Sequence, residues 1–337
     1  MLVGSETSAS GARAGEKEHV FEERKGDITA RMLMNHTNGT GMSFFNTALR
    51  DYRGEEDLAT TNEGTAYFEN LLKSPLLWQP GEKTNYGQGF DWLSVLIERM
   101  TGKALEDVLR ENIFAPLGIE HGGIKGEWGG RAVAGSGVDF WPASLKVGDG
   151  SFMTLPGWAE TKVEREDAWP GGKTHVQSVA NGLVLSPADL ARMYSVLLPQ
   201  NGGVDPVTGV RILSPAAAAE VAKLHHAEDI RNNSRDIPSA SPIIMPYASQ
   251  GEHVDPEGWF GLGAAVQGAD RKLPDGRRGR SKGSVYWHGA SNAEYWIDGE
   301  KGIVVVVVAN FFPFMEEGWV EFLRGLEGMI YEGLESE

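Results

Sequence analysis

Apolar residues recur every three or four positions along much of the first two thirds of the chain, and this spacing predicts helices. Leu93, Leu96 and Ile97, for example, lie on one face of a helix predicted over residues 90–100. The same pattern predicts helices over residues 28–36, 66–72 and 105–113. This part of the chain is therefore expected to be mainly helical.

A serine followed by a proline marks the start of two further predicted helices, at Ser186 and Ser214. A capping serine accepts a hydrogen bond from a free amide of the first turn, and a proline at the first helical position has a φ angle that already suits a helix. Over residues 120–180 and 230–258, glycines, prolines and tryptophans interrupt any period, which predicts long ordered loops.

From Trp259 onward the pattern changes to one typical of strands. Short runs of β-branched and aromatic residues are separated by turn residues at close spacing, which favours an antiparallel meander. The strands are predicted over residues 259–266, 284–288, 293–298 and 303–309. Residues 319–331 then return to helical spacing, and we expect this last helix to cover one face of the sheet.

These patterns divide the chain into three parts. Residues 1–26 contain few apolar side chains and are predicted to form a flexible leader or surface loop without a core strand. Residues 27–225 are predicted to form a mainly helical domain with long loops, and residues 226–337 an antiparallel sheet with a C-terminal helix. The predicted architecture is α/β of the α+β type.

Composition and charge narrow the classes of function. The chain has 47 acidic and 31 basic residues, a net charge of −16, which disfavours nucleic acid and anionic membrane as partners. The basic residues between Arg271 and Lys282 are predicted to form a solvated loop tip, with a docking surface for an acidic partner as the alternative. The longest apolar run, residues 303–309, is far shorter than the ~20 residues of a membrane helix.

The absence of certain residues and signals narrows the classes of function further. There is no cysteine, so disulfides, a thiol nucleophile and cysteine-ligated metals are excluded, and the eight histidines show no metal-ligand spacing. No signal segment of basic and then apolar residues opens the chain. We therefore expect a cytoplasmic protein without metal or other cofactor, whose oligomeric state the sequence leaves open.

Four segments occur in an informative order. They are residues 28–39 (ITARMLMNHTNG), residues 80–92 with Tyr86 at their centre, residues 181–191 (NGLVLSPADLA), and His288-Gly289-Ala290. Together they resemble the serine β-lactamase-like family, in particular its class C-like esterases and fungal-type acyltransferases. The resemblance extends from about Asp27 over nearly the whole remaining chain. It implies a β-lactamase/transpeptidase-like fold and a small-molecule ester or acyl substrate.

In that family the chemistry is acyl transfer through a serine ester. Tyr86 matches the tyrosine of the second motif, which implies that it moves a proton to or from the leaving group with a pKa lowered by nearby cations. His288 stands where β-lactamases usually keep a lysine, and this favours an esterase or transesterase over a lactamase. The simpler interpretations are an ordinary loop tyrosine and a histidine at the end of a strand. His36 lies in a segment where the family's histidine is mostly structural.

The resemblance also implies residues that bind substrate. The family often has Tyr-Ser-Asn where this chain has Tyr-Gly-Gln, so the amide of Gln88 is longer by one methylene. After His288, the strand edge at Gly289, Ala290 and Ser291 is expected to offer a backbone amide to the oxyanion. Residues 289–293 also approximate a nucleophile elbow around Ser291, but that motif needs a helix after the turn, and a strand is predicted there.

The family's first motif, Ser-x-x-Lys, occurs nowhere in these 337 residues. We therefore expect the chain to be an incomplete, inactive version of a longer serine hydrolase or acyltransferase. The alternative is a non-catalytic pseudoenzyme or scaffold protein that binds a ligand in the acyl pocket. Without the missing segment, residues 303–309 are expected to form an exposed apolar sheet edge. The five consecutive valines at residues 304–308 include no compensating charge, which favours the incomplete enzyme.

Overall fold

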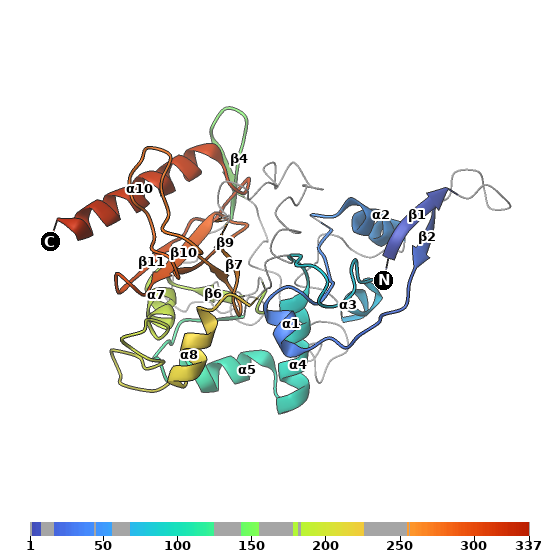
Figure 1. The fold of residues 1–337 in the computed structure, drawn as a ribbon, viewed down its shortest axis with the longest axis horizontal. Coiled ribbons are helices and arrows are strands. Elements are labelled where there is room, and N and C mark those ends of the chain that lie inside the picture. Colours follow the sequence, from blue (N-terminus) through green and yellow to red (C-terminus); the bar gives the residue numbers. More distant parts are fainter. Residues whose placement is uncertain are drawn as a thin grey trace.

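The computed structural model contains a sheet-based lobe and a helical lobe, seen side by side in Figure 1. The structure describes residues 2–7, 17–43, 45–55, 68–124, 143–154, 178–180, 183–225, 255 and 257–336. The C-terminal helix lies on the sheet-based lobe, and a hairpin near the N-terminus lies at the opposite end of the molecule (Figure 1). The predicted α/β architecture of β-lactamase/transpeptidase type is confirmed.

The sheet-based lobe contains a five-stranded antiparallel sheet in the order β11-β10-β9-β8-β7. Its strands are β7 (Trp259–Phe260), β8 (Ala265–Val266), β9 (Val285–Gly289), β10 (Ala293–Asp298) and β11 (Ile303–Val307). Spatial order follows chain order, so the predicted meander is confirmed. The single strand expected over residues 259–266 is two short strands, because the backbone turns at Gly263 with a φ of 99°.

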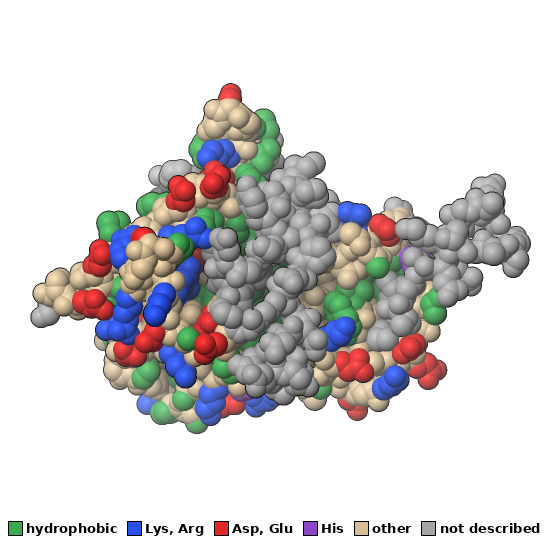
Figure 2. Space-filling model, turned by 45° about the horizontal axis from the view of Figure 1, so that its top comes forward, with side chains coloured by type: hydrophobic (Ala, Val, Ile, Leu, Met, Phe, Trp, Pro, Cys, Tyr) green, Lys and Arg blue, Asp and Glu red, His purple; other side chains and the backbone are tan. Residues whose placement is uncertain are grey.

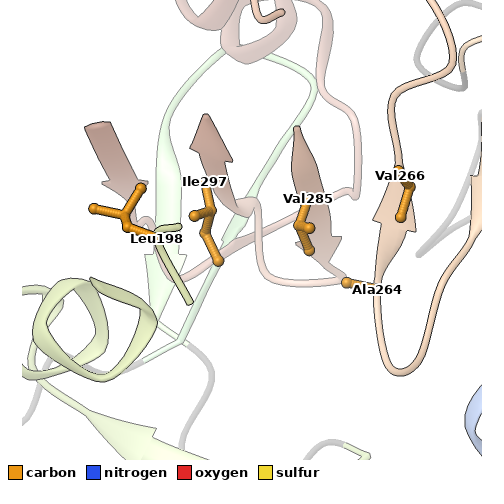
Figure 3. Close-up of a cluster of buried hydrophobic side chains, with 5 residues drawn as sticks. All are labelled: Leu198, Ala264, Val266, Val285 and Ile297. Carbon is orange, nitrogen blue, oxygen red and sulfur yellow. The ribbon is translucent and has the colours of Figure 1, made fainter. Parts of the chain in front are cut away.

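Helices cover both faces of this sheet. On one face, Tyr331 of α10 (Glu317–Glu335) packs in a cluster with Tyr286 and Trp296. On the other face, α7 (Pro187–Ser195) and α8 (Pro215–Val221) pack against five buried apolar side chains. Figure 3 shows these side chains, which are Leu198, Ala264, Val266, Val285 and Ile297. Helices thus cover both faces, and β11 is left as an outer strand whose residues are half-buried.

The helical lobe contains short helices, four of which lie close to predicted ones, whereas the helix over residues 47–55 was not predicted. They are α1 (Ala30–Met34), α2 (Thr47–Glu55), α3 (Phe68–Lys73), α4 (Gly89–Thr101) and α5 (Leu105–Leu109), the last running into a π-helical turn at Arg110–Phe114. Helix α4 packs Val95 against Leu71 of α3 and ends at Gly102, whose left-handed conformation (φ 67°) suits glycine. Ser186 and Ser214 cap α7 and α8 as predicted.

Several short strands were not expected from the sequence. A flexible leader is predicted over residues 1–26, but β1 (Leu2–Thr7) and β2 (Lys17–Phe21) pair there as an antiparallel hairpin. Two further sheets pair β3 (Gly122–Ile124) with β6 (Leu183–Leu185), and β4 (Ser144–Lys146) with both β5 (Phe152–Thr154) and β12 (Phe311–Phe312). Strands of two or three residues are too short to show an alternating pattern, so periodicity does not reveal them.

The basic residues between Arg271 and Lys282 form a hairpin turn, but the expectation of a fully solvated tip is wrong for Arg280. Its side chain is only 1% exposed, because Glu294 and Glu327 neutralise its charge inside the lobe. At the surface, Figure 2 shows acidic and basic side chains interspersed on the face that it draws. Among the described residues, no helix is both long and apolar enough to cross a membrane. Most of the predicted long loops lie outside the described residues.

Candidate active site

Tyr86 lies immediately before α4 in a cluster of aromatic rings. Its ring stacks on Trp287 of β9 with a centroid distance of 5.5 Å, and its side chain hydrogen-bonds with Trp287. The His36 ring lies 4.9 Å away, and Phe45 meets Tyr86 edge-on at 5.9 Å. The cluster joins the start of α4, the segment after α1 and the central sheet.

The surroundings of Tyr86 raise the pKa of its hydroxyl group. Burial is the largest cause, the hydrogen bond with Trp287 acts in the opposite direction, and the negative charge of Asp91 raises the pKa further. The resemblance implies that nearby cations lower the pKa of Tyr86. This expectation is wrong for this structure, because the nearby charge is the carboxylate of Asp91, which raises the pKa. Tyr86 is a neutral phenol near pH 7 and can donate a proton but not accept one.

Gln88 is buried two residues after Tyr86, at the first turn of α4. Its side chain is 1% exposed, and neither its amide nitrogen nor its amide oxygen has a hydrogen-bond partner among the described residues. Glycine is needed beside it, because a Cβ at position 87 would lie 2.5 Å from the carbonyl oxygen of Thr40. This close backbone contact keeps the start of α4, and with it Gln88, in the interior. A buried amide without a partner costs about 1–3 kcal/mol.

His288 lies at the end of β9 and is 9% exposed. Its ring stacks on Trp287 at a centroid distance of 4.6 Å and lies 5.3 Å from Phe314. Phe314 belongs to the apolar cluster against which Tyr86 also packs. The structure therefore brings the tyrosine of the second motif and the histidine of the third together around Trp287.

The residues after His288 form the turn between β9 and β10. Gly289 ends β9, Ala290 is exposed, Ser291 is half-buried, and the backbone amide of Asn292 donates to the carbonyl oxygen of Gly289 over 3.0 Å. The strand β10 follows this turn. The nucleophile elbow around Ser291 is therefore excluded, as expected, because it requires a helix at this point.

Two hydrogen bonds attach the chain just before the third segment of the resemblance to α4. The hydroxyl of Ser178 donates to Asp91 Oδ1 over 2.5 Å, and the backbone amide of Val179 donates to the hydroxyl of Ser94 over 3.2 Å. Asp91 is 4% exposed. The chain just before Asn181 is thus held against the helix that begins at Gln88.

Sequence reasoning missed one of the residues nearest to Tyr86. Trp287 was not singled out, although it lies between the motif histidine and the strand, and an aromatic residue directly before the motif was the available signal. His36 was interpreted as structural; its ring lies against Tyr86 and, at 4.5 Å, against Phe260. Among the described residues, no group of three or more His, Cys, Asp or Glu side chains is placed to hold a metal ion.

Comparison with known proteins places this geometry in context. The family model described as Beta-lactamase matches residues 17–324. Monacolin J acid methylbutanoyltransferase from Aspergillus terreus is 27% identical over 321 residues, a match that covers 92% of this chain and 68% of that protein. Lovastatin esterase from Penicillium rubens is 27% identical over 278 residues, which covers 80% of this chain and 61% of the esterase.

Among solved structures, a mutant of simvastatin synthase from Aspergillus terreus aligns with a TM-score of 0.73 at 26% identity. The alignment covers 100% of this chain and 71% of the synthase chain. The family match extends over most of the chain, and two of the four segments that carry the sequence resemblance converge around Trp287. The chain therefore belongs to the beta-lactamase family.

Proposed function

We propose that the protein binds a small-molecule ester or acyl donor, as a relative of the hydrolases and acyltransferases of the beta-lactamase fold, and that these 337 residues alone do not turn it over. The observation that carries this proposal is Gln88, which is buried two residues after Tyr86 and whose two amide atoms have no partner among the residues that the structure describes. A buried polar group left unpaired needs an explanation, and pairing with a ligand or catalytic group is one. The similarity to a methylbutanoyltransferase and to an esterase supports an ester or acyl group as the ligand.

In this proposal each part of the site has a role. In a protein that also supplies the family's serine, the serine oxygen would bond to the acyl carbon as the bond to the leaving oxygen breaks. The neutral Tyr86 phenol would then donate its proton to the leaving oxygen and regain one from the serine hydroxyl, since its raised pKa keeps it protonated near pH 7. The amide of Gln88 pairs with a carbonyl and a hydroxyl of the ligand. The backbone amides of Ala290 and Ser291 donate to the oxyanion. His288, which stacks on Trp287, faces the reacting group from the end of β9.

These 337 residues contain no Ser-x-x-Lys, and this favours a second candidate, a non-catalytic protein that binds the same class of ligand. Both candidates predict binding without turnover for this chain. An in-frame Ser-x-x-Lys upstream in the gene would distinguish them. If that segment is present, the longer protein should turn over esters, and a Tyr86→Phe change should lower its rate by about 10²- to 10⁴-fold.

The test of turnover is fluorophosphonate labelling of the purified 337-residue chain, run beside a p-nitrophenyl ester assay. We expect no labelled serine and no turnover. A labelled serine with turnover would show that the chain contains an unrecognised nucleophile, and the inactivity proposed here would be wrong.

The test of binding is calorimetric titration with ethyl 2-methylbutanoate, an ester probe whose acyl group is one of the methylbutanoyl groups, the class that the name of the similar transferase gives. Wild type should bind, and Gln88→Leu should lose most of its affinity, because the ligand would lose both amide hydrogen bonds. Gln200→Leu is the matched control, since Gln200 is exposed. Equal affinity of wild type and Gln88→Leu, or no binding by wild type, would overturn the proposal.

A further inference from the structure

The turn between β9 and β10 is held by one buried side chain. Asn292 is 2% exposed, and its amide nitrogen donates to the carbonyl oxygens of Phe311 over 3.0 Å and Pro313 over 2.9 Å. Its amide oxygen accepts from the backbone amide of Met315 over 2.8 Å. A single side chain thus makes hydrogen bonds with three backbone groups of a loop about 20 residues further along the chain.

Backbone hydrogen bonds connect the same two segments. The amide of Ala309 donates to the carbonyl oxygen of Asn292 over 3.2 Å. The amide of Phe311 donates to the carbonyl oxygen of Ser291 over 3.2 Å. Within the turn, the Asn292 amide donates to Gly289. The turn at residues 289–292 and the loop at residues 309–315 therefore form one connected unit.

Asparagine suits this position for two reasons. Its φ angle is 60°, a left-handed conformation in which asparagine is enriched and most side chains are strained. Its amide group can donate two hydrogen bonds and also accept one, whereas a carboxylate of the same shape only accepts. The orientation of the amide is fixed by its partners, because two of them are carbonyls and one is an N–H.

Both segments of this unit face the candidate site. The turn contains Ala290 and Ser291, whose amides are the proposed oxyanion donors. The loop contains Phe314, which lies 5.3 Å from the His288 ring and in the cluster against which Tyr86 packs. A shift of the loop would therefore move a wall of the site, and a shift of the turn would move its donors.

We propose that Asn292 is a positioning residue of this acyl site. It holds the turn at residues 289–292 and the loop at residues 309–315 in a fixed position relative to each other. This inference rests on the proposed function for its consequence in binding. Two variants separate the contributions of the side chain. Asn292→Gly keeps the left-handed backbone and removes all three side-chain hydrogen bonds, whereas Asn292→Asp keeps the acceptor for Met315 and loses the donor.

The first readout is hydrogen exchange of the Met315 amide. In Asn292→Gly this amide should exchange at least about tenfold faster, because its acceptor is gone. In Asn292→Asp at neutral pH the carboxylate faces two carbonyl oxygens, so we expect a raised pKa for the new carboxyl group and a displaced loop. As the pH falls through this raised pKa, above the ordinary aspartate value of about 4, the protonated carboxyl can donate again, and Met315 protection should recover.

The second readout is affinity for ethyl 2-methylbutanoate. Asn292→Gly should bind about tenfold more weakly than wild type, and Asn292→Asp should regain affinity as the pH falls. Tyr331→Phe is the control, because it removes a buried hydrogen bond of α10 far from the turn and should lower stability without changing affinity. A role limited to stability would leave all three variants with the affinity of wild type.

The outcomes separate this inference from the proposed function. Fast Met315 exchange together with weak binding in Asn292→Gly supports both. Wild-type exchange of Met315 in Asn292→Gly, or unchanged affinity, overturns the positioning role. If wild type binds no probe, the proposed function fails, and Met315 exchange alone then decides whether Asn292 holds the loop.

Discussion

Two buried polar regions of this protein differ in how far their side chains are paired. Beside α10, the Arg280 guanidinium is 1% exposed and bonds both Glu327 and Glu294 through Nε and Nη2, and only its Nη1 has no partner among the described residues. At the start of α4, Gln88 is equally buried, yet neither of its amide atoms has a partner among the described residues. Paired groups fix how the sheet packs on α10, whereas an amide with neither atom paired lowers stability.

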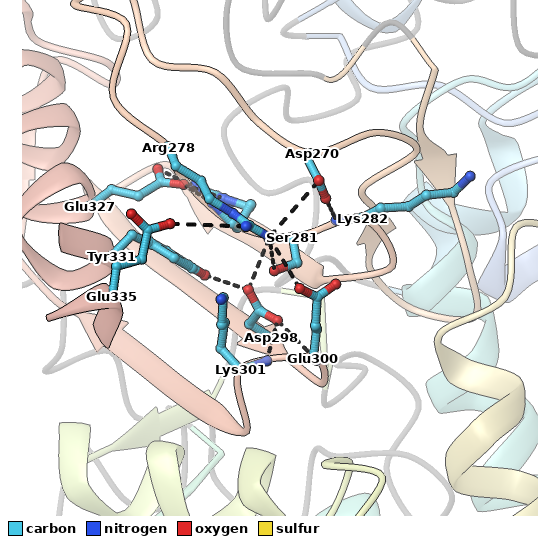
Figure 4. Close-up of polar contacts among 11 residues, drawn as sticks. Asp270, Arg278, Ser281, Lys282, Asp298, Glu300, Lys301, Glu327, Tyr331 and Glu335 are labelled. Carbon is cyan, nitrogen blue, oxygen red and sulfur yellow. Dashed lines mark hydrogen bonds and ion pairs between the residues drawn. The ribbon is translucent and has the colours of Figure 1, made fainter. Parts of the chain in front are cut away.

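The region beside α10 is an extended network. Arg280 Nη2 lies 2.7 Å from Glu294 Oε1 and 3.0 Å from Glu327 Oε2, and its guanidinium stacks over the rings of Tyr286 and Trp296 at 4.7 and 4.9 Å. Figure 4 shows the adjoining part, where Tyr331, Asp298 and Ser281 meet. Burial alone would raise the pKa of Glu327, but the charges of Arg280 and Arg271 lower it overall, so Glu327 is ionised.

The strongest test of this comparison is Glu327→Ala. Arg280 would then keep a buried charge with one carboxylate removed, and we expect a loss of about 3–5 kcal/mol in the free energy of unfolding. The measurement is urea denaturation. Glu300→Ala is the matched control, because its pair with Arg278 is exposed and should contribute at most about 1 kcal/mol. Equal losses in both variants would show that the network is no more stabilising than a surface pair.

The sequence predicted the elements in which a local signal is strong. Helices α7 and α8 begin at serine caps followed by proline, and α10 shows clear helical spacing. Motif order singled out Tyr86 and His288 as candidate site residues. The sequence could not predict that Tyr86 contacts Trp287, because that contact joins residues about 200 positions apart.

Contacts between residues far apart in the sequence also explain why the expectation for Arg280 was wrong. Its sequence neighbours are basic and polar, which is typical of a solvated loop, and the acidic partner that buries it is 47 residues further along the chain. The role of Asn292 was hidden for a similar reason. Its partners lie beyond β11, and a single asparagine in a turn gives no signal of such contacts.

A second test uses the other end of α4, where Glu98 is 0% exposed. Glu98 Oε1 accepts from the Leu105 amide over 2.9 Å, but Oε2 has no partner among the described residues. Burial raises the pKa of Glu98 from 4.5 to about 7, and the Leu105 hydrogen bond opposes this only in part. The folded protein therefore keeps a proton that the unfolded chain releases.

The stability contributed by this proton is fully present below the ordinary pKa of glutamate and is lost as the pH rises through about 7. We expect a loss on the order of 3 kcal/mol between about pH 4.5 and 8. Urea denaturation across this range, compared between wild type and Glu98→Gln, isolates the contribution, because glutamine does not titrate. The same pH dependence in both proteins would contradict the assignment.

The third test should change stability in the opposite direction. Gln88→Leu replaces an unpaired buried amide with an apolar side chain, and we expect the free energy of unfolding to rise by about 1–3 kcal/mol in the absence of ligand. Gln200→Leu, at an exposed position, should leave it unchanged. If Gln88→Leu is destabilised instead, the amide is already paired within the protein, and the contrast between the two regions fails.

The smallest effect is expected for Tyr331→Phe, within the paired region. The Tyr331 hydroxyl donates to Asp298 Oδ2 over 2.6 Å, but Asp298 also accepts from the backbone amides of Ser281, Glu300 and Lys301. These donors remain in the variant, so the carboxylate stays satisfied and the loss should be only about 1 kcal/mol by urea denaturation. A loss as large as that of Glu327→Ala would mean that the hydroxyl and the ion pairs act as one cooperative unit, because removing a single redundant donor would then disrupt them all.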